Sequence, residues 1–371
     1  NIRITALHTP GHTPEHMSYL VTDIGGGAAE PMGIATGDFV FVGDVGRPDL
    51  LESAAGVAGA KEPSARALYQ SLKRFVELPE YLQVWPGHGA GSACGKALGA
   101  IPQSTVGYEK RFNVAVSQST GEEGGFVASI LEGQPEPPPY FARMKRENKT
   151  GPALLGGVPS PAHATIDDVT AAASRGAVVV DTRKWNSFAA GHVAGALHAP
   201  LNKAYPTVVG SYIEPEKEVW LVCDDAQVRD AVLGLIRVGL DRIAGYVTPA
   251  EVQSWVDAGH GEAIAQVSIG EFAARATAGP IHVLDVRGLG EFEAGHVVGA
   301  VNVAHTRLAP ELASIPRDAP VYVHCQSGVR SAYAAAFLER EGIDTVYVGP
   351  GGYPEIAAAG VAVETETVVA Q

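Results

Sequence analysis

The sequence has few cysteines, few basic residues and no long apolar run. Its three cysteines, Cys94, Cys223 and Cys325, are widely spaced among 371 residues. That number and spacing fit neither a disulfide framework nor a paired-cysteine metal site, so a reducing cytoplasm is the expected location. No apolar run approaches the ~18 residues that a membrane span needs, and no signal-peptide pattern opens the chain. We therefore expect a soluble protein without a membrane partner.

Positive charge is scarce: 27 Lys and Arg stand against 41 Asp and Glu, which gives a formal net charge of −14. The average field of such a protein repels nucleic acid and anionic lipid, so neither is an expected partner. An anionic substrate must instead meet a local cluster of positive groups.

An internal repeat organises the second part of the chain. Asp181, Gly191, His192 and Gly195 recur as Asp285, Gly295, His296 and Gly299, each 104 residues later. In both copies strand-like runs alternate with helical patterns, which predicts two small α/β domains with doubly wound parallel sheets. We place them at residues 163–260 and 261–371.

The first part of the chain, residues 1–145, differs from the repeat. It has short strand-like runs separated by glycine-rich turns and one amphipathic helical pattern near residues 64–77. Proline and glycine are frequent after residue 131, and we interpret residues 146–162 as a linker.

The second copy of the repeat places a cysteine where a reactive thiol is expected. The strand-like run VYVH ends at Cys325, and the loop Gln326, Ser327, Gly328 and Val329 leads to Arg330 and a helical pattern. Backbone N–H groups of such a loop, a helix N-terminus and an arginine all lower a thiol pKa from its usual value of about 8.5. The alternative is that Cys325 is a small buried apolar residue.

These motifs resemble the rhodanese (sulfurtransferase) family over residues 265–360. The resemblance implies that Cys325 accepts a sulfane sulfur as a persulfide and passes it on, with its loop as the cradle and Arg330 beside the sulfur or its cargo. We interpret Asp285 and Arg287 as structural rather than catalytic.

The first copy departs from this pattern. Arg229 follows Cys223 by six residues, whereas Arg330 follows Cys325 by five. Alignment on the arginines puts Asp224 at the nucleophile position, where it would repel an anionic persulfide. We expect a degenerate domain that is structural or binds a partner, although a one-residue loop insertion would leave Cys223 usable.

Three groups in the first part of the chain are candidate metal ligands. His12, Asp44 and His88 each follow a strand-like run and stand next to glycine, in TPGHT, VGDVGRPDL and WPGHG. A rigid sheet presents ligands on such loops at one edge.

These segments resemble the second half of a metallo-β-lactamase fold, and specifically its persulfide dioxygenase branch. The resemblance implies a mononuclear Fe(II) held by a histidine of an early HxHxDH motif together with His12 and Asp44. The resemblance also implies that His88 belongs to a second metal position, which dioxygenases leave empty and di-zinc hydrolases fill. No HxHxDH motif occurs here, and the chain starts at Asn1. We expect a truncated form of a longer protein, the alternative being a crippled metal site.

The expected fold is therefore α/β and α+β multidomain, with part of a metallo-β-lactamase αββα sandwich followed by two rhodanese-like domains. The expected function is a bacterial persulfide dioxygenase and sulfurtransferase of sulfide detoxification. Its small molecules would be a thiol persulfide, O₂, sulfite and thiosulfate. The alternatives are a zinc glyoxalase II-like thioester hydrolase with a rhodanese appendage, and a scaffold for sulfur relay without metal catalysis. The carrier thiol, the direction of sulfur transfer and a homo-oligomeric state stay open.

Overall fold

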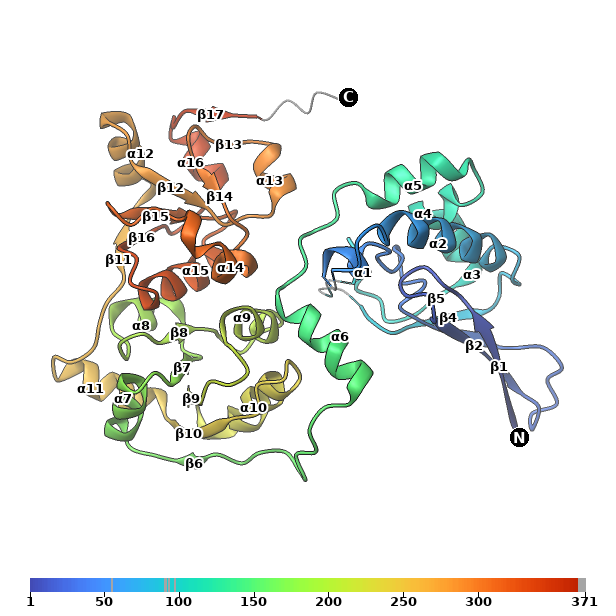
Figure 1. Cartoon of the computed structure of the whole chain (residues 1–371), viewed down its shortest axis with the longest axis horizontal. Helices are drawn as coiled ribbons and strands as arrows, with labels where there is room; N and C mark the ends of the chain where they lie inside the picture. The colour runs from blue at the N-terminus through green and yellow to red at the C-terminus, as the bar shows by residue number, and fades with distance from the viewer. Residues whose placement is uncertain (55, 90–91, 93, 97, 366–371) are drawn as a thin grey trace. The chain divides into compact units, whose positions relative to one another are not determined.

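The computed structural model of residues 1–371 divides into two compact units, Asn1–Pro137 and Pro138–Gln371 (Figure 1). It describes every residue except 55, 90–91, 93, 97 and 366–371. Within the part that is described, no helix combines the length and the apolar character needed to cross a bilayer.

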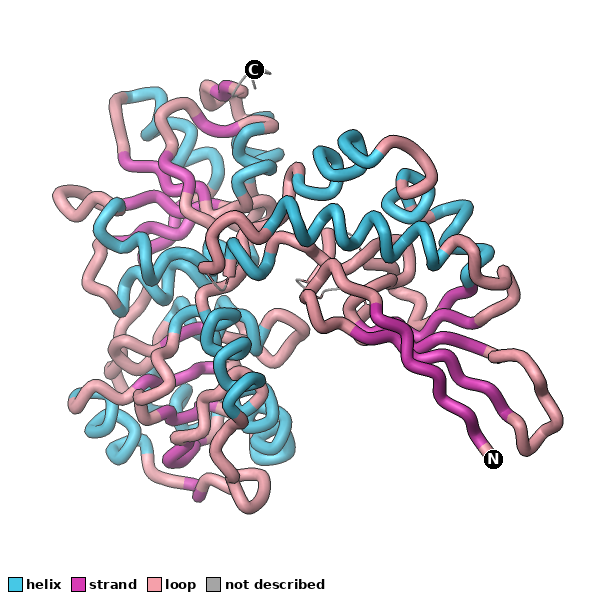
Figure 2. Tube along the Cα trace, turned by 45° about the vertical axis from the view of Figure 1, so that its right-hand side comes forward, coloured by secondary structure: helices cyan, strands magenta, loops and turns pink. Residues whose placement is uncertain are grey.

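The N-terminal unit is built on one mixed five-stranded sheet in the order β1-β2-β3-β4-β5. The first three strands pair antiparallel, and β3 pairs parallel with β4. Figure 2 shows β1 and β2 as two long neighbouring strands near the N-terminus. The strands are β1 (Ile2–His8), β2 (Met17–Asp23), β3 (Gly33–Gly37), β4 (Gln83–Pro86) and β5 (Ser104–Thr105).

Helices of the N-terminal unit pack on this sheet through one apolar cluster. Ile34 of β3 and Val84 of β4 meet Leu68, Leu72 and Phe75 of α2 there. The apolar residues of α2 recur every three or four positions, so they form one face of the helix. The helices are α1 (Leu50–Ser53), α2 (Lys61–Phe75), α3 (Val106–Phe112), α4 (Val114–Gln118) and α5 (Glu123–Leu131).

The second unit contains both copies of the repeat, called here the first module (β6 to α11) and the second module (β11 to β17). The first module has a parallel sheet in the order β6-β10-β9-β7-β8. Its elements are β6 (Ala162–His163), α7 (Ile166–Ser174), β7 (Val178–Asp181), α8 (Trp185–Ala190), β8 (Leu197–His198), α9 (Tyr205–Tyr212), β9 (Val219–Val222), η1 (Asp225–Gln227), α10 (Val228–Ile236), β10 (Ile243–Val247) and α11 (Pro249–Asp257).

The second module repeats this topology with a parallel sheet in the order β11-β16-β15-β12-β14. Its elements are β11 (Ala265–Val267), α12 (Ile269–Ala278), β12 (His282–Asp285), α13 (Leu289–Glu293), β13 (His296–Val297), β14 (Val301–Asn302), η2 (His305–Arg307), α14 (Leu308–Glu311), η3 (Leu312–Ser314), β15 (Val321–His324), α15 (Val329–Arg340), β16 (Thr345–Val348), α16 (Tyr353–Ala358) and β17 (Val363–Glu364). The predicted pair of doubly wound α/β domains is confirmed.

Both faces of each parallel sheet are buried. In β7, Val178 and Val180 enter the cluster that contains α9 and α10 residues, whereas Val179 enters the cluster with Val169 of α7 and Val252 of α11. Successive strand side chains point to opposite faces, so an unbroken apolar run such as VVV marks a strand covered on both sides.

Helix α15 joins the two modules. All residues from Ser331 to Leu338 are buried. Those from 332 to 338 divide between two apolar clusters that also contain first-module residues. Ala332, Ala335 and Ala336 lie in the cluster with Phe188, and Phe337 stacks on Tyr212 with ring centroids 4.4 Å apart. A helix that is buried all round needs apolar partners on every side, and here both modules supply them.

Polar contacts fix the register of this module interface. Tyr212 Oη donates to the His305 carbonyl at 2.8 Å, and Arg340 Nη1 donates to the Gly195 carbonyl at 2.6 Å. His192 Nε2 lies 2.8 Å from Glu339 Oε2.

The boundary between the units differs from the sequence-based one. Helix α6 (Tyr140–Thr150) spans residue 145, where the first domain was predicted to end. Tyr140 belongs to the apolar core of the second unit and lies against Gly210, where an added Cβ would come within 2.8 Å of the Tyr140 ring. The start of the predicted linker is therefore helical.

We expect Phe337→Ala to destabilise both modules, although Phe337 belongs to the second. Loss of a buried phenylalanine costs about 3–5 kcal/mol, and the shared core transmits this loss. The tryptophans of the second unit, Trp185, Trp220 and Trp255, all lie in the first module. Their fluorescence transition in urea, in a Trp85→Phe background, should shift to lower denaturant.

Phe112→Ala is the matched control, because Phe112 is 65% exposed and lies in the N-terminal unit. An unchanged tryptophan transition in Phe337→Ala would show that the two modules unfold independently.

Candidate functional site

Cys325 lies at the junction of β15 and α15, on the carboxyl edge of the second parallel sheet. Its side chain is buried, and Ser331 Oγ lies 3.5 Å from Sγ, positioned to donate a hydrogen bond. The Cys325 carbonyl accepts from Tyr353 N at 2.8 Å. α15 begins at Val329, so the positive end of a twelve-residue helix follows the thiol within four residues.

The loop after Cys325 depends on a glycine. Gly328 has φ +88°, and a Cβ there would come within 2.6 Å of Tyr347 Oη and 3.1 Å of the Gly351 carbonyl. Tyr347 Oη donates to the Gly328 carbonyl at 3.3 Å. Gln326 and Ser327 are exposed above the buried sulfur. The predicted cradle residues therefore form one tight turn between the strand and the helix.

Arg330 is held by a carboxylate that the sequence analysis did not single out. Its Nη1 and Nη2 donate to the two Glu291 carboxylate oxygens at 2.6 and 2.7 Å. These bonds raise the pKa of Arg330, and the Cys325 charge contributes in the same direction. The same pair lowers the pKa of Glu291. The arginine thus lies in a fixed geometry next to the thiol loop.

Asp285 and Arg287 form a buried pair below this loop. Arg287 Nε and Nη2 donate to the Asp285 carboxylate at distances down to 2.6 Å, and Nη2 also donates to the Gly295 carbonyl. Arg287 Nη1 lies 3.4 Å from Gln326 Oε1, and the guanidinium stacks on the Tyr353 ring at 4.0 Å. These contacts brace the segments around Cys325.

The first module places Cys223, and not Asp224, at the position of Cys325. Val222 pairs with Asp181 across the sheet in the same way that His324 pairs with Asp285, so each cysteine directly follows the corresponding strand. The prediction that aligned Arg229 with Arg330, and so placed Asp224 at the nucleophile position, is therefore wrong. The extra residue lies after the cysteine, where Asp225–Gln227 form a 3-10 turn.

The surroundings of Cys223 disfavour a thiolate. Its side chain is fully buried and points its Sγ toward the Asp224 carbonyl at 3.5 Å. Burial raises the pKa of Cys223 to about 11, and the charges of Asp224, Asp230 and Asp225 add to the effect. No glycine occurs in this loop. The first module keeps the thiol but lacks the glycine turn of the second module.

In the N-terminal unit, His12 and His88 converge on Asp38. His88 Nε2 lies 2.9 Å from Asp38 Oδ1, and His12 Nε2 lies 3.8 Å from Asp38 Oδ2. Asp38 directly follows β3 and His88 closely follows β4, so neighbouring parallel strands present both at one edge of the sheet. Asp38, His88 and Cys94 have ligand atoms within 4.8 Å of one another.

Asp38, and not the predicted ligand Asp44, is the carboxylate that lies beside His12 and His88 in the ion pairs described above. The Asp44 carboxylate accepts from Val45 N at 2.8 Å, and its carbonyl accepts from Asn113 Nδ2 at 2.9 Å, so Asp44 braces its own loop. Both aspartates follow glycine after a strand-like run, in TGD and VGD. Only the tertiary contacts distinguish them.

The described residues of this cluster fit a cation. His12 Nδ1 lies 3.1 Å from the Arg47 carbonyl, which can only accept, so Nε2 is the nitrogen left for a ligand. Asp38 Oδ1 faces His88 Nε2 at 2.9 Å, and Asp38 N donates to His16 Nε2 at 3.1 Å. The nearby Asp38 carboxylate raises the pKa of His88 to about 10.

Comparison with known proteins identifies the class that these sites define. Residues 165–251 and 268–359 match the Rhodanese-like domain family. A thiosulfate sulfurtransferase of Shewanella oneidensis is 31% identical over 87 residues, which are 24% of this chain and 86% of that protein. A probable metallo-hydrolase of Burkholderia pseudomallei is 34% identical over 129 residues, 34% of this chain and 40% of that protein.

A solved structure covers more of the chain. A metallo-beta-lactamase from Staphylococcus aureus is 43% identical, with a TM-score of 0.60, over 67% of this chain and 68% of that one. Residues 1–137 are only 37% of the 371, so this match extends into the second unit. The chain spans only part of some relatives. It covers 56% of the length of the protein YqhL of Bacillus subtilis.

The fold and sites define a metallo-β-lactamase-type domain joined to tandem sulfurtransferase-type modules. The chain belongs to the rhodanese-like domain family and carries two copies of that domain behind its metallo-β-lactamase-like part. Both resemblances drawn from the sequence are confirmed at this level, while the dioxygenase branch stays a prediction.

We expect Cys223 to react as a thiol of raised pKa. In native protein, its alkylation by iodoacetamide should keep accelerating from pH 9 to pH 11, because the pKa of Cys223 is raised to about 11. In urea, the same cysteine should level off above its ordinary pKa of about 8.5. Peptide mass spectrometry measures both rates, and equal pH profiles in the two states would contradict the raised pKa.

Proposed function

We propose that the second module is a sulfurtransferase whose sulfur carrier is Cys325, coupled to a persulfide dioxygenase in the metallo-β-lactamase-like domain. The observation that carries the proposal is the Cys325 turn itself. A thiol is buried at a strand–helix junction, next to Ser331 and beside an arginine fixed by Glu291.

The transfer would proceed in two balanced steps. The Cys325 thiolate attacks the outer sulfur of a persulfide RSSH, the S–S bond breaks, RS⁻ leaves and Cys325 becomes a persulfide. Sulfite then attacks the outer sulfur of that persulfide, a second S–S bond breaks, and thiosulfate leaves with the proton while the thiolate is regenerated. Each step exchanges one S–S bond for another, so neither needs an external oxidant.

Arg330 gives these anionic steps the local positive charge that a chain of net charge −14 does not provide on average. Its guanidinium is fixed by Glu291, so no side-chain entropy has to be lost when an anion arrives. Ser331 Oγ can donate to Sγ and stabilise the thiolate before and after each transfer.

The N-terminal cluster would hold Fe(II) through His12 and Asp38. Bound iron would supply O₂ activation for the overall reaction RSSH + O₂ + H₂O → RSH + SO₃²⁻ + 2H⁺. His16 accepts from Asp38 N and the Arg47 carbonyl orients His12, so both ligands have supporting contacts. The sulfite formed is the acceptor that the Cys325 persulfide needs, which is a reason to join the two activities in one chain.

A zinc hydrolase is the second candidate. The observation in its favour is that His88 and Cys94 lie within ligand distance of Asp38, which suits a second metal. The relative from Burkholderia pseudomallei is also described as a probable metallo-hydrolase.

We expect Cys325→Ser to reduce thiosulfate formation from a thiol persulfide and sulfite by at least about a hundredfold, because the nucleophile is removed. Cys223→Ser is the matched control and should keep full activity, since Cys223 lies in a loop that disfavours its thiolate. Thiosulfate is measured by chromatography. Equal losses in both variants would contradict the assignment to Cys325.

Asp38→Asn should weaken iron binding by at least about tenfold, because it removes an anionic ligand oxygen. Asp44→Asn keeps the acceptor for Val45 N and should bind iron as the parent does. Anaerobic Fe(II) titration measures both affinities. The reverse order would restore Asp44 as the ligand. Two bound zinc ions with thioester cleavage and no oxygen uptake would favour the hydrolase.

A further inference from the structure

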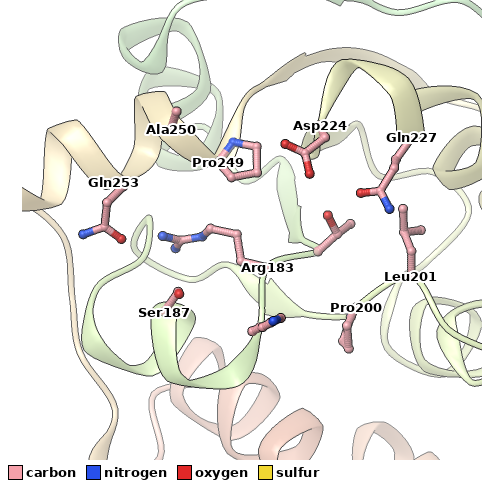
Figure 3. A pocket seen from close by; sticks show the side chains of 11 residues that line it. Arg183, Ser187, Pro200, Leu201, Asp224, Gln227, Pro249, Ala250 and Gln253 are labelled. Atoms are coloured by element: carbon pink, nitrogen blue, oxygen red, sulfur yellow. The ribbon is translucent and has the colours of Figure 1, made fainter.

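The first module contains a cavity that the sulfur chemistry does not use. It has a volume of about 590 Å³ and lies at the carboxyl edge of the first module's parallel sheet. Cys325 occupies the equivalent edge of the second module. Four segments line it (Figure 3): the β7–α8 connection with Arg183 and Lys184, which leads to Ser187 of α8; Pro200 and Leu201 after β8; the turn after Cys223 with Asp224; and the first turns of α11 with Gln253.

A buried donor without a partner lies in the wall of this cavity. Arg183 is 7% exposed. Its Nε and Nη2 donate to the Asp181 carboxylate, and Nη2 also donates to the Gly191 carbonyl. Within the described residues, Arg183 Nη1 has no hydrogen-bond partner. A guanidinium cannot lose its proton in a protein, and an unmet buried donor is costly, so the site is suited to an incoming acceptor.

The second copy of the repeat shows how such a donor is normally used. Arg287 makes the same bonds to Asp285 and Gly295, and its Nη1 lies 3.4 Å from Gln326 Oε1 of the thiol loop. In the first module, Asp224 follows the cysteine in place of Gln326. The first copy therefore keeps the donor and lacks the internal acceptor.

The cavity is open because the segment after β10 is short. In the second module, residues 349–352 separate β16 from α16, Tyr353 stacks on Arg287 at 4.0 Å, and Gly352 packs against the Gln326 backbone. In the first module, α11 begins at Pro249, only two residues after β10 ends. Pro249 and Ala250 line the cavity there (Figure 3).

Charge is divided between the walls of the cavity. Donors come from the β7–α8 side, with Arg183, Lys184 and Ser187, and a carboxylate comes from Asp224 on the other side. Figure 3 shows the Arg183 and Asp224 side chains directed toward the same space from different elements. Asp181 balances Arg183 in a buried ion pair, and Lys184 and Asp224 add one charge of each sign to the lining. A wholly anionic ligand would meet Asp224, whereas a ligand with both charges would find a partner for each.

We propose that this cavity binds a small zwitterion of the α-amino-acid type. Its carboxylate accepts from Arg183 Nη1 and Lys184, and its ammonium group donates to Asp224. The free amino acid and the amino-acid end of a peptide thiol share this chemistry. The proposal does not depend on sulfur transfer, because Arg183, Lys184 and Asp224 act without any thiol.

Isothermal titration calorimetry on the full chain tests the proposal with S-methylglutathione, which has an amino-acid end but no reactive thiol. Binding should weaken at least about tenfold in Asp224→Asn and in Lys184→Gln, each of which removes one charge-assisted bond. Both residues are exposed, so both variants should fold. Asp225→Asn is the matched control, because Asp225 accepts from Tyr246 Oη outside the lining and should leave affinity unchanged.

Glutamate and coenzyme A complete the test. Equal binding of glutamate and S-methylglutathione indicates a free amino acid, and tighter binding of S-methylglutathione indicates a peptide thiol. The proposal is overturned if neither binds, if coenzyme A or sulfite binds better than both, or if Asp225→Asn weakens binding as much as Asp224→Asn. The experiment measures heat of binding and not sulfur transfer. A negative result for this proposal can therefore be distinguished from a negative result for sulfur transfer at Cys325.

Discussion

The burial of α15 between the two modules is the interaction on which the second unit depends. Every residue from Ser331 to Leu338 is buried, and its alanines allow the first module to approach closely on one side while Phe337 stacks on Tyr212 on the other. The same helix carries the turn around Cys325 at its N-terminus. The thiol is thus attached to a helix that is buried between the two modules, and its position relative to Arg330 and Ser331 is fixed by packing as well as by the loop.

The two copies of the repeat share a scaffold and differ at their turns. Asp181 with Arg183 and Asp285 with Arg287 make the same buried pair, so the sheet edge is built alike in both. One extra residue after Cys223 and the absence of a glycine change the first turn, and acidic neighbours replace the arginine–glutamate pair. The first module keeps the interface that positions α15, and its unused edge becomes a cavity with different chemistry.

In the N-terminal unit, too, the candidate functional side chains lie at one edge of a sheet. Strands β3 and β4 run parallel and end at one edge, where Asp38 and His88 meet, and the β1–β2 connection brings His12 to the same place. Rigid strands supply the geometry and short loops supply the donors, as expected where functional groups must be held without flexible support.

Periodicity and repetition in the sequence determined the modules, their parallel sheets and the position of Cys325, because a buried strand followed by a glycine turn and a helix is a local pattern. The choice between Asp38 and Asp44 was decided only by tertiary structure, since both follow a glycine after a strand-like run and only three-dimensional contacts with His12 and His88 separate them. Glu291 was missed for the same reason, as it lies 39 residues from Arg330. Strand register likewise showed that Cys223 and Cys325 occupy equivalent positions in the two modules. Alignment on the nearest arginine places the one-residue insertion before the cysteine, whereas it lies after the cysteine. Local spacing predicts which elements form, whereas long-range packing decides which side chains meet.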